Sequence, residues 1–187
     1  MSGKQHNVFL VGLMAVGKST VGRLLAAELG FSFYDSDRVI EDRAGAEVAW
    51  IFDVEGEAGF REREMHAVDE LSRRSGIVLA TGGGVVLREE NRRHLKERGT
   101  VVWLDTPLER LVERTRRDKR RPLLREGNVR ETLERLGRER SPLYQEVADL
   151  RFCADRHTPR SLAAEIAGAF RNSRCVHGCE DEGPAHG

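Results

Sequence analysis

Residues 12–20, GLMAVGKST, match the pattern G-x-x-x-x-G-K-[ST] of a phosphate-binding loop. The flanks fit this motif, because the apolar run Val8–Val11 predicts a buried strand before the loop. Apolar residues at helical spacing follow it: Val21, Leu24, Leu25 and Leu29. In such a loop, backbone N–H groups and the positive end of a helix hold phosphate oxygens, Lys18 reaches the outer phosphates and Ser19 offers its hydroxyl to Mg²⁺. We therefore predict that residues 12–20 bind a nucleoside triphosphate; the alternative is a glycine-rich turn that happens to precede a helix.

Two carboxylates, Asp35 and Asp37, stand one residue apart at the end of the second predicted strand, Phe31–Asp35. If the strand conformation continues, both side chains lie on one face. One would then hold Mg²⁺ through water, and the other would accept a proton from a substrate hydroxyl. The alternative is an ordinary helix N-cap formed by Ser36 or Asp37.

A further aspartate competes with Asp35 for the metal. Asp105 follows the apolar run Val101–Leu104, as in a Walker B magnesium site. It also stands directly before Thr106 and Pro107, which predict a helix start with Thr106 as the cap, and acidic residues are common there because of the helix dipole. Asp35 is therefore the preferred metal residue.

Glycines and arginines mark the remaining candidate segments. Gly82–Gly84, after the predicted strand Ile77–Ala80, allow close backbone approach, with a loose turn as the alternative. The basic run 116–124 is either a solvated face or a mobile lid that places an arginine on a transferring phosphoryl group. Arg61 lies in a charge-rich segment typical of a surface helix, and Arg140 precedes a proline that interrupts a helical pattern.

The order of these elements predicts an α/β fold, with a five-stranded, mostly parallel sheet flanked by helices. Besides the strands already named, Leu150–Cys153 is the fifth, and Asn128 and Thr158 are expected to cap helices. Ligands bind at the carboxyl ends of such strands. We expect one domain over residues 1–171 and a disordered tail over 172–187. Two cysteines and two histidines in this tail, Cys175, His177, Cys179 and His186, leave a zinc site open as an alternative.

Composition limits the function classes. The 187 residues carry a net charge of zero, which gives no whole-protein field toward nucleic acid or a membrane surface. No apolar stretch approaches the roughly 20 residues needed to span a bilayer. The polar N-terminus and the three cysteines predict a cytoplasmic protein without a disulfide framework.

Taken together, these segments resemble the shikimate kinase family from about Val8 to Phe170. A phosphate loop alone is unspecific, whereas six features in one order are far more specific. The features are Gly12–Thr20, Asp35-Ser36-Asp37, Phe60-Arg61, Gly82-Gly83-Gly84, Arg121-Pro122-Leu123-Leu124 and Arg140-Ser141-Pro142-Leu143-Tyr144. The resemblance implies a P-loop kinase with a lid at about 115–127 and a substrate-binding segment at about 36–64. It further implies transfer of the ATP γ-phosphoryl to the 3-hydroxyl of shikimate, with Mg²⁺, in aromatic amino-acid biosynthesis, by a monomer whose partners are ATP and shikimate.

The resemblance also assigns roles to residues. ATP would be bound by Ala15, Val16, Gly17, Lys18, Ser19, Thr20 and Arg121, with Arg121 as the lid arginine over the γ-phosphate. Ser19 and Asp35 would serve the metal. Shikimate would be bound by Asp37, Arg61, Gly83 and Arg140, with the two arginines on its carboxylate. Lys18, Asp37 as the base and Arg121 would be catalytic, and Arg114 and the turn 156–159 would flank the adenine.

One residue departs from the family pattern, because Ala15 stands where the family usually has glycine. If this position needs a positive φ, Ala15 is strained. Two other functions stay open: a gluconate-kinase-like sugar kinase, and a nucleotide-binding module without catalysis.

Overall fold

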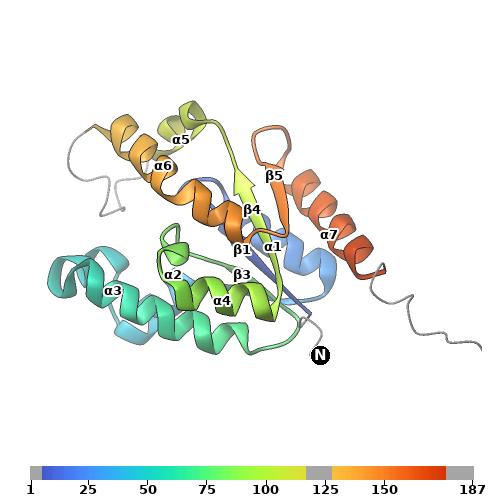
Figure 1. Ribbon diagram of the computed structural model, residues 1–187, viewed down its shortest axis with the longest axis horizontal. Coiled ribbons are helices and arrows are strands. Elements are labelled where there is room, and N and C mark those ends of the chain that lie inside the picture. Colours follow the sequence, from blue (N-terminus) through green and yellow to red (C-terminus); the bar gives the residue numbers. More distant parts are fainter. Residues whose placement is uncertain (1–5, 117–127, 176–187) are drawn as a thin grey trace, which may run out of the picture.

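The protein was analysed as a computed structural model in which residues 6–116 and 128–175 are described (Figure 1). Residues 117–127, which make up most of the predicted lid at about 115–127 and include Arg121, lie outside the described residues. So do residues 176–187, which include His177, Cys179 and His186. The strands are β1 (Asn7–Val11), β2 (Ser32–Asp35), β3 (Ile77–Ala80), β4 (Thr100–Asp105) and β5 (Leu150–Cys153). The helices are α1 (Lys18–Leu29), α2 (Ser36–Ala44), α3 (Val48–Ser72), α4 (Glu89–Arg98), α5 (Leu108–Thr115), α6 (Val129–Val147) and α7 (Pro159–Cys175), with a short 3₁₀ helix, η1 (Val85–Leu87).

The five strands form one parallel sheet in the order β2-β3-β1-β4-β5. All five predicted strands are confirmed, with ends that differ by at most one residue. The central strands β1 and β3 are buried along their whole length, as continuous apolar runs require when helices cover both faces. The two edge strands are only partly buried.

Successive strand residues point to opposite faces of the sheet and so build two apolar cores. On one face, Val8 and Leu10 pack with residues of α1 and α7. On the other face, Phe9 and Val11 pack with residues of α3, α4 and the C-terminal end of α6. Figure 1 shows α3, α4 and α6 together on one side of the sheet. The sheet is thus covered on both faces, and ligand sites are confined to its edge at the strand ends.

Two of the three predicted helix caps are confirmed. The Asn128 side chain accepts from the Arg130 N–H at 3.0 Å, and the Thr158 hydroxyl accepts from the Ser161 N–H at 3.2 Å. The cap predicted at Thr106 is wrong, because α5 begins one residue later and its first bonds run to the Pro107 carbonyl. Thr106 is buried, and its hydroxyl has no hydrogen-bond partner among the described residues.

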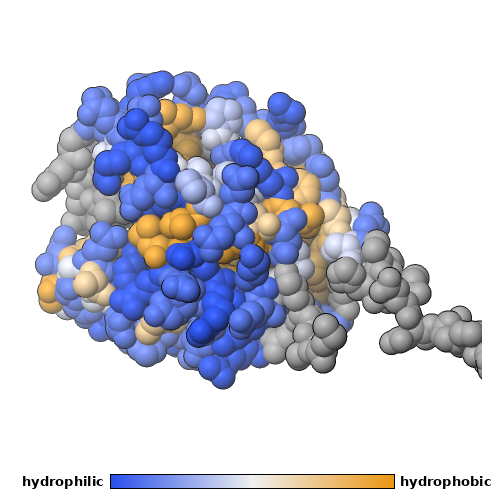
Figure 2. All heavy atoms as spheres, in the orientation of Figure 1, coloured by the Kyte–Doolittle hydropathy of each residue, from blue (hydrophilic) through white to orange (hydrophobic). Residues whose placement is uncertain are grey.

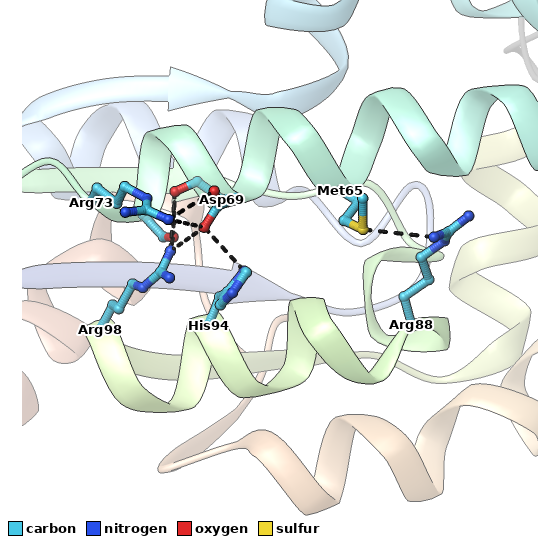
Figure 3. Close-up of polar contacts among 7 residues, drawn as sticks. Met65, Asp69, Arg73, Arg88, His94 and Arg98 are labelled. Carbon is cyan, nitrogen blue, oxygen red and sulfur yellow. Dashed lines mark hydrogen bonds and ion pairs between the residues drawn. The ribbon is translucent and has the colours of Figure 1, made fainter.

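A polar contact between α3 and α4 holds these two helices together (Figure 3). The Asp69 carboxylate of α3 accepts from Arg98 of α4 at 2.8 Å and from Arg73 at 3.1 Å. These hydrogen bonds, the one from Arg98 above all, lower the pKa of Asp69 to about 2. Arg88, just before α4, contacts the Met65 sulfur at 3.6 Å. The second half of α3 is therefore fixed against the body of the domain, and it is the half that carries Arg61.

The polar character of the surface agrees with the many charged residues in the sequence. Figure 2 shows one face covered mostly by hydrophilic residues, with apolar residues in smaller patches. Within the described ranges, no helix combines the length and the apolar character that a membrane span needs. Helix α7 continues to Cys175, three residues past Asn172, where the tail is expected to begin.

Candidate active site

The phosphate-loop prediction is matched by the local structure, in which residues 12–17 connect β1 to α1. Gly12 and Gly17 adopt φ values of 142° and 106°, which favour glycine. A Cβ atom on Gly12 would lie 2.3 Å from the Leu104 carbonyl oxygen, so that position has no room for a side chain. Helix α1 begins at Lys18, and the N–H groups of its first turn have no partner within the helix. The loop therefore has the form of an anion-binding turn.

Two cations pack on the carbonyl groups of this loop. The buried Lys18 ammonium donates to the Gly12 carbonyl at 2.7 Å and to the Leu13 carbonyl at 2.8 Å. Arg114 of α5 donates to the carbonyls of Ala15 and Val16 at 3.2 and 3.1 Å. Positive charge is thus concentrated where phosphate groups would be bound.

Ala15 has a φ of 64° and is the only non-glycine residue with a positive φ in the described part of the chain. This left-handed conformation costs an alanine roughly 1–2 kcal/mol. The departure from the family pattern therefore strains the loop, and the Arg114 hydrogen bond to the Ala15 carbonyl contributes to holding it.

The two aspartates after β2 are arranged differently from the prediction. The strand ends at Asp35 and α2 begins at Ser36, so the strand conformation does not continue to Asp37. The predicted cap by Ser36 or Asp37 is also wrong, because Asp35 itself caps α2 by accepting from the Asp37 N–H at 3.1 Å. Its other oxygen, Oδ2, accepts from the Ser19 hydroxyl at 2.5 Å. Asp35 therefore links the phosphate loop to α2.

Asp105, the competing aspartate, is engaged elsewhere. One of its oxygens accepts from Arg151 at 2.6 Å and the other from the Thr106 N–H at 2.9 Å. Asp35, and not Asp105, shares a hydrogen bond with the hydroxyl of the phosphate loop.

The three glycines after β3 allow the close approach expected of them. The Gly82 N–H donates to the buried Ser36 hydroxyl at 3.1 Å. A Cβ atom on Gly82 would lie 2.7 Å from Glu64 Oε1 and 2.8 Å from Asp37 Oδ1. One on Gly84 would lie 2.1 Å from the Arg61 guanidinium. The loose-turn alternative is wrong, because charged side chains pack closely against both Gly82 and Gly84.

Arg61 lies on the side of α3 that faces the protein interior, and not on the exposed side of this helix. It is only 8% exposed, and its guanidinium donates from Nη1 to Glu64 Oε2 at 2.8 Å. It also donates from Nε and Nη2 to Glu57 Oε1 at 3.3 and 3.0 Å. Burial alone would lower the pKa of Arg61, but the two carboxylates outweigh this effect and its pKa is raised. Arg61 is therefore a fixed positive charge inside the molecule.

Arg140 reaches the same place from α6 and is 2% exposed. Its Nη1 atom lies near Gly83, and its Nε has no hydrogen-bond partner among the described residues. The predicted interruption at Pro142 is wrong, because α6 runs through it from Val129 to Val147. One turn after Arg140, the buried Tyr144 hydroxyl donates to the Gly83 carbonyl, and burial raises the pKa of Tyr144. The continuous helix thus places Arg140 and Tyr144 on one buried face.

Glu64 and Tyr144 are the site residues whose roles sequence reasoning missed. Glu64 is completely buried, which raises the pKa of its carboxyl, while the charges of Arg61 and Arg140 act in the opposite direction. Its spacing of three residues from Arg61 on a helix is the signal from which this ion pair could have been found.

These side chains enclose a cavity of about 430 Å³. Of the predicted site residues, it is lined by Ser19, Asp35, Asp37, Arg61, Gly83 and Arg140. The apolar part of the wall comes from Met14, Val48, Ala49, Phe52 and Phe60. The other predicted phosphate-loop residues, Ala15, Val16, Gly17, Lys18 and Thr20, do not line it. Four arginines line this cavity, and two of them, Arg61 and Arg140, are buried. Buried guanidinium groups together with carboxylates suit a small anion that also carries hydroxyl groups.

A second cavity lies beside the phosphate loop, where Arg114 contacts it. Its lining residues are Arg110, Glu113, Arg114 and Asp155. Asp155 directly precedes the turn 156–159, so the two segments expected near the adenine lie together in the fold.

Comparison with known proteins agrees with this arrangement. The family model described as shikimate kinase matches residues 14–171. The chain belongs to the shikimate kinase family. A shikimate kinase from Actinobacillus succinogenes is 53% identical over 170 residues, which cover 90% of this chain and 97% of the relative. Family membership makes the chain an ATP-dependent small-molecule kinase with the P-loop kinase fold, as predicted.

Solved structures give the same family. A shikimate kinase from Acinetobacter baumannii in complex with shikimate has a TM-score of 0.88 and 46% sequence identity, covering 91% of this chain and 95% of that one. A gluconokinase from Sinorhizobium meliloti has a TM-score of 0.56 and 14% identity, with coverages of 94% and 98%. The second likeness shows a shared fold alone, so it adds nothing to the gluconate alternative.

Proposed function

We propose that this chain transfers the γ-phosphoryl group of ATP to the 3-hydroxyl of shikimate, giving shikimate 3-phosphate and ADP, as a step of aromatic amino-acid biosynthesis. The observation that carries this proposal is the pair of buried arginines, Arg61 and Arg140, in one cavity with Asp37. Shikimate has a planar carboxylate and neighbouring hydroxyls. Guanidinium groups bind carboxylates through paired hydrogen bonds, and a carboxylate accepts from hydroxyls.

Each predicted site residue of the cavity then has a defined role in binding or catalysis. Arg61 and Arg140 bind the substrate carboxylate. Asp37 accepts hydrogen bonds from the hydroxyls and takes the proton of the attacking one. The Gly83 backbone contacts the ring, and Tyr144 positions Gly83 by its hydrogen bond to the carbonyl. The second cavity, with Arg114, accommodates the adenine.

Phosphoryl transfer of this kind needs positioning and neutralisation of charge more than covalent chemistry by the protein. The loop residues Ala15, Val16, Gly17, Ser19 and Thr20 bind the phosphates together with Lys18. The Lys18 ammonium exchanges its loop carbonyl partners for phosphate oxygens. Arg121 covers the γ-phosphate; this assignment rests on the family resemblance.

Mg²⁺ is part of this proposal. The Ser19 hydroxyl and the Asp35 carboxylate, 2.5 Å apart, are the hard oxygen donors that this ion prefers. No group of three or more His, Cys, Asp or Glu side chains that could hold a metal ion occurs among the described residues. This fits Mg²⁺, which is usually held by one or two protein groups, substrate phosphates and water. When bound, the ion neutralises phosphate charge.

Asp35→Asn is expected to weaken Mg²⁺-dependent turnover by about 10–100-fold, the usual effect of losing a residue that orients a metal ligand. Asp105→Asn, the matched control, is expected to change it less than about twofold, because Asp105 is engaged by Arg151. The measurement is a Mg²⁺ titration of ADP release at saturating shikimate. A larger loss of turnover in Asp105→Asn than in Asp35→Asn would show that the proposal places the metal at the wrong strand end.

The substrate itself is tested by a coupled ADP-release assay with shikimate, gluconate and nucleoside monophosphates as acceptors. Shikimate alone is expected to stimulate Mg²⁺-dependent ADP release. Equal stimulation by gluconate would refute the assignment, and absent turnover with every acceptor would favour the nucleotide-binding module. The single domain over 1–171, the lid, the cytoplasmic location and the monomeric state stay predictions from the sequence.

A further inference from the structure

The edge of Arg61 that is best suited to a carboxylate already holds one. Its Nε and Nη2 atoms both donate to Glu57 Oε1, at 3.3 and 3.0 Å. These two nitrogens form the side of the guanidinium that commonly takes part in paired hydrogen bonds with carboxylates and phosphates. Glu57 thus occupies, through one carboxylate oxygen, the edge of Arg61 that a substrate carboxylate would use.

The two carboxylates on Arg61 differ in their access to water. Glu64 is completely buried, whereas the Glu57 side chain is 50% exposed. A buried carboxylate that leaves its partner becomes an uncompensated charge without water around it, which is strongly unfavourable. A half-exposed one exchanges its partner for water at little cost, since exposed ion pairs at this helical spacing are weak. Glu64 is therefore the permanent partner of Arg61, and Glu57 the exchangeable one.

We propose that Glu57 is an internal competitor of the substrate, which the substrate carboxylate displaces from Arg61 on binding. This inference rests on the proposed function. Displacement lowers the apparent affinity for the substrate, because the Arg61–Glu57 hydrogen bonds are broken before the new ones form. It also keeps the buried guanidinium paired while the cavity holds no substrate.

The test is Glu57→Gln, which keeps the shape of the side chain and removes its charge. The Michaelis constant for shikimate is expected to fall about threefold, the size of effect usual for a partly exposed ion pair. The dissociation constant from calorimetric titration of shikimate is expected to fall in parallel. Turnover at saturating shikimate is expected to change little, because Glu57 has already left Arg61 once shikimate is bound. A fall in turnover with unchanged shikimate affinity would overturn the inference.

Glu62→Gln is the matched control on the same helix. Glu62 is 53% exposed and pairs with Arg88 instead of Arg61, so this variant is expected to leave the Michaelis constant unchanged. Glu57→Ala serves as a second variant and is expected to lower the constant likewise. An unchanged or raised Michaelis constant in both Glu57 variants, with active wild-type enzyme, would overturn this inference alone. A wild-type chain that fails to phosphorylate shikimate would overturn the proposed function and this inference with it.

Discussion

Asp37→Asn is expected to lower the turnover of shikimate by about 10²–10⁴-fold, the usual contribution of a general base. Asparagine has nearly the same shape and retains a hydrogen-bond acceptor, but it cannot take a proton. Asp37 stands in the first turn of α2, in the cavity wall, with Oδ1 against Gly82. The loss should therefore appear in turnover more than in the binding of shikimate.

The measurement is steady-state ADP release, with kcat and KM determined separately for shikimate. Asp42→Asn, an exposed aspartate of the same helix, is the control and is expected to behave like the wild type. Retained turnover together with a raised KM would show that Asp37 binds the substrate hydroxyls without accepting the proton.

Arg140→Lys is expected to raise the Michaelis constant for shikimate by about 10–100-fold, which corresponds to losing a charge-assisted hydrogen bond worth roughly 1.5–3 kcal/mol. Lysine keeps the charge but cannot form the paired hydrogen bonds of a guanidinium. Arg140 is almost completely buried, so water does not replace the lost contact. Turnover at saturating shikimate should change much less, because this interaction is made in the ground state and in the transition state alike.

Arg135→Lys is the control for this prediction. It lies on the same helix, is 64% exposed and pairs with Glu139, so its kinetics should match the wild type. The melting temperature of each variant separates a binding defect from an unfolded protein. An equal loss of turnover and affinity in Arg140→Lys would argue against a role limited to holding the carboxylate.

The sequence by itself determined the elements whose signals are local. Short apolar runs predicted four of the five strands, because a strand covered on both faces needs apolar side chains at nearly every position. The second strand, Phe31–Asp35, has a weaker signal and lies at a partly buried edge of the sheet. The pattern G-x-x-x-x-G-K-[ST] predicted the phosphate loop, because its backbone conformation depends on glycines a few residues apart. The six ordered motifs were specific enough to indicate the family, which the comparisons confirm.

Local sequence signals gave wrong predictions for three features: two helix caps and one helix interruption. Thr106, Ser36 and Asp37 are all suitable caps, yet Asp35 caps α2 and none of these three caps its helix by a side-chain bond. Pro142 was expected to interrupt a helix that in fact continues. Preferences of this kind amount to only a few kcal/mol at most, so interactions with neighbouring groups can outweigh them.

The tertiary structure alone decided how the charges are distributed in the site. Helical spacing places Arg61 and Glu64 on one side of α3, but it does not tell whether that side meets water or the protein interior. Packing of α3 and α6 against the same face of the sheet brings Arg61, Glu64 and Arg140 together, although up to 79 residues separate them in the sequence. Burial then determines which ion pairs are permanent, because a charge that cannot reach water must keep its partner.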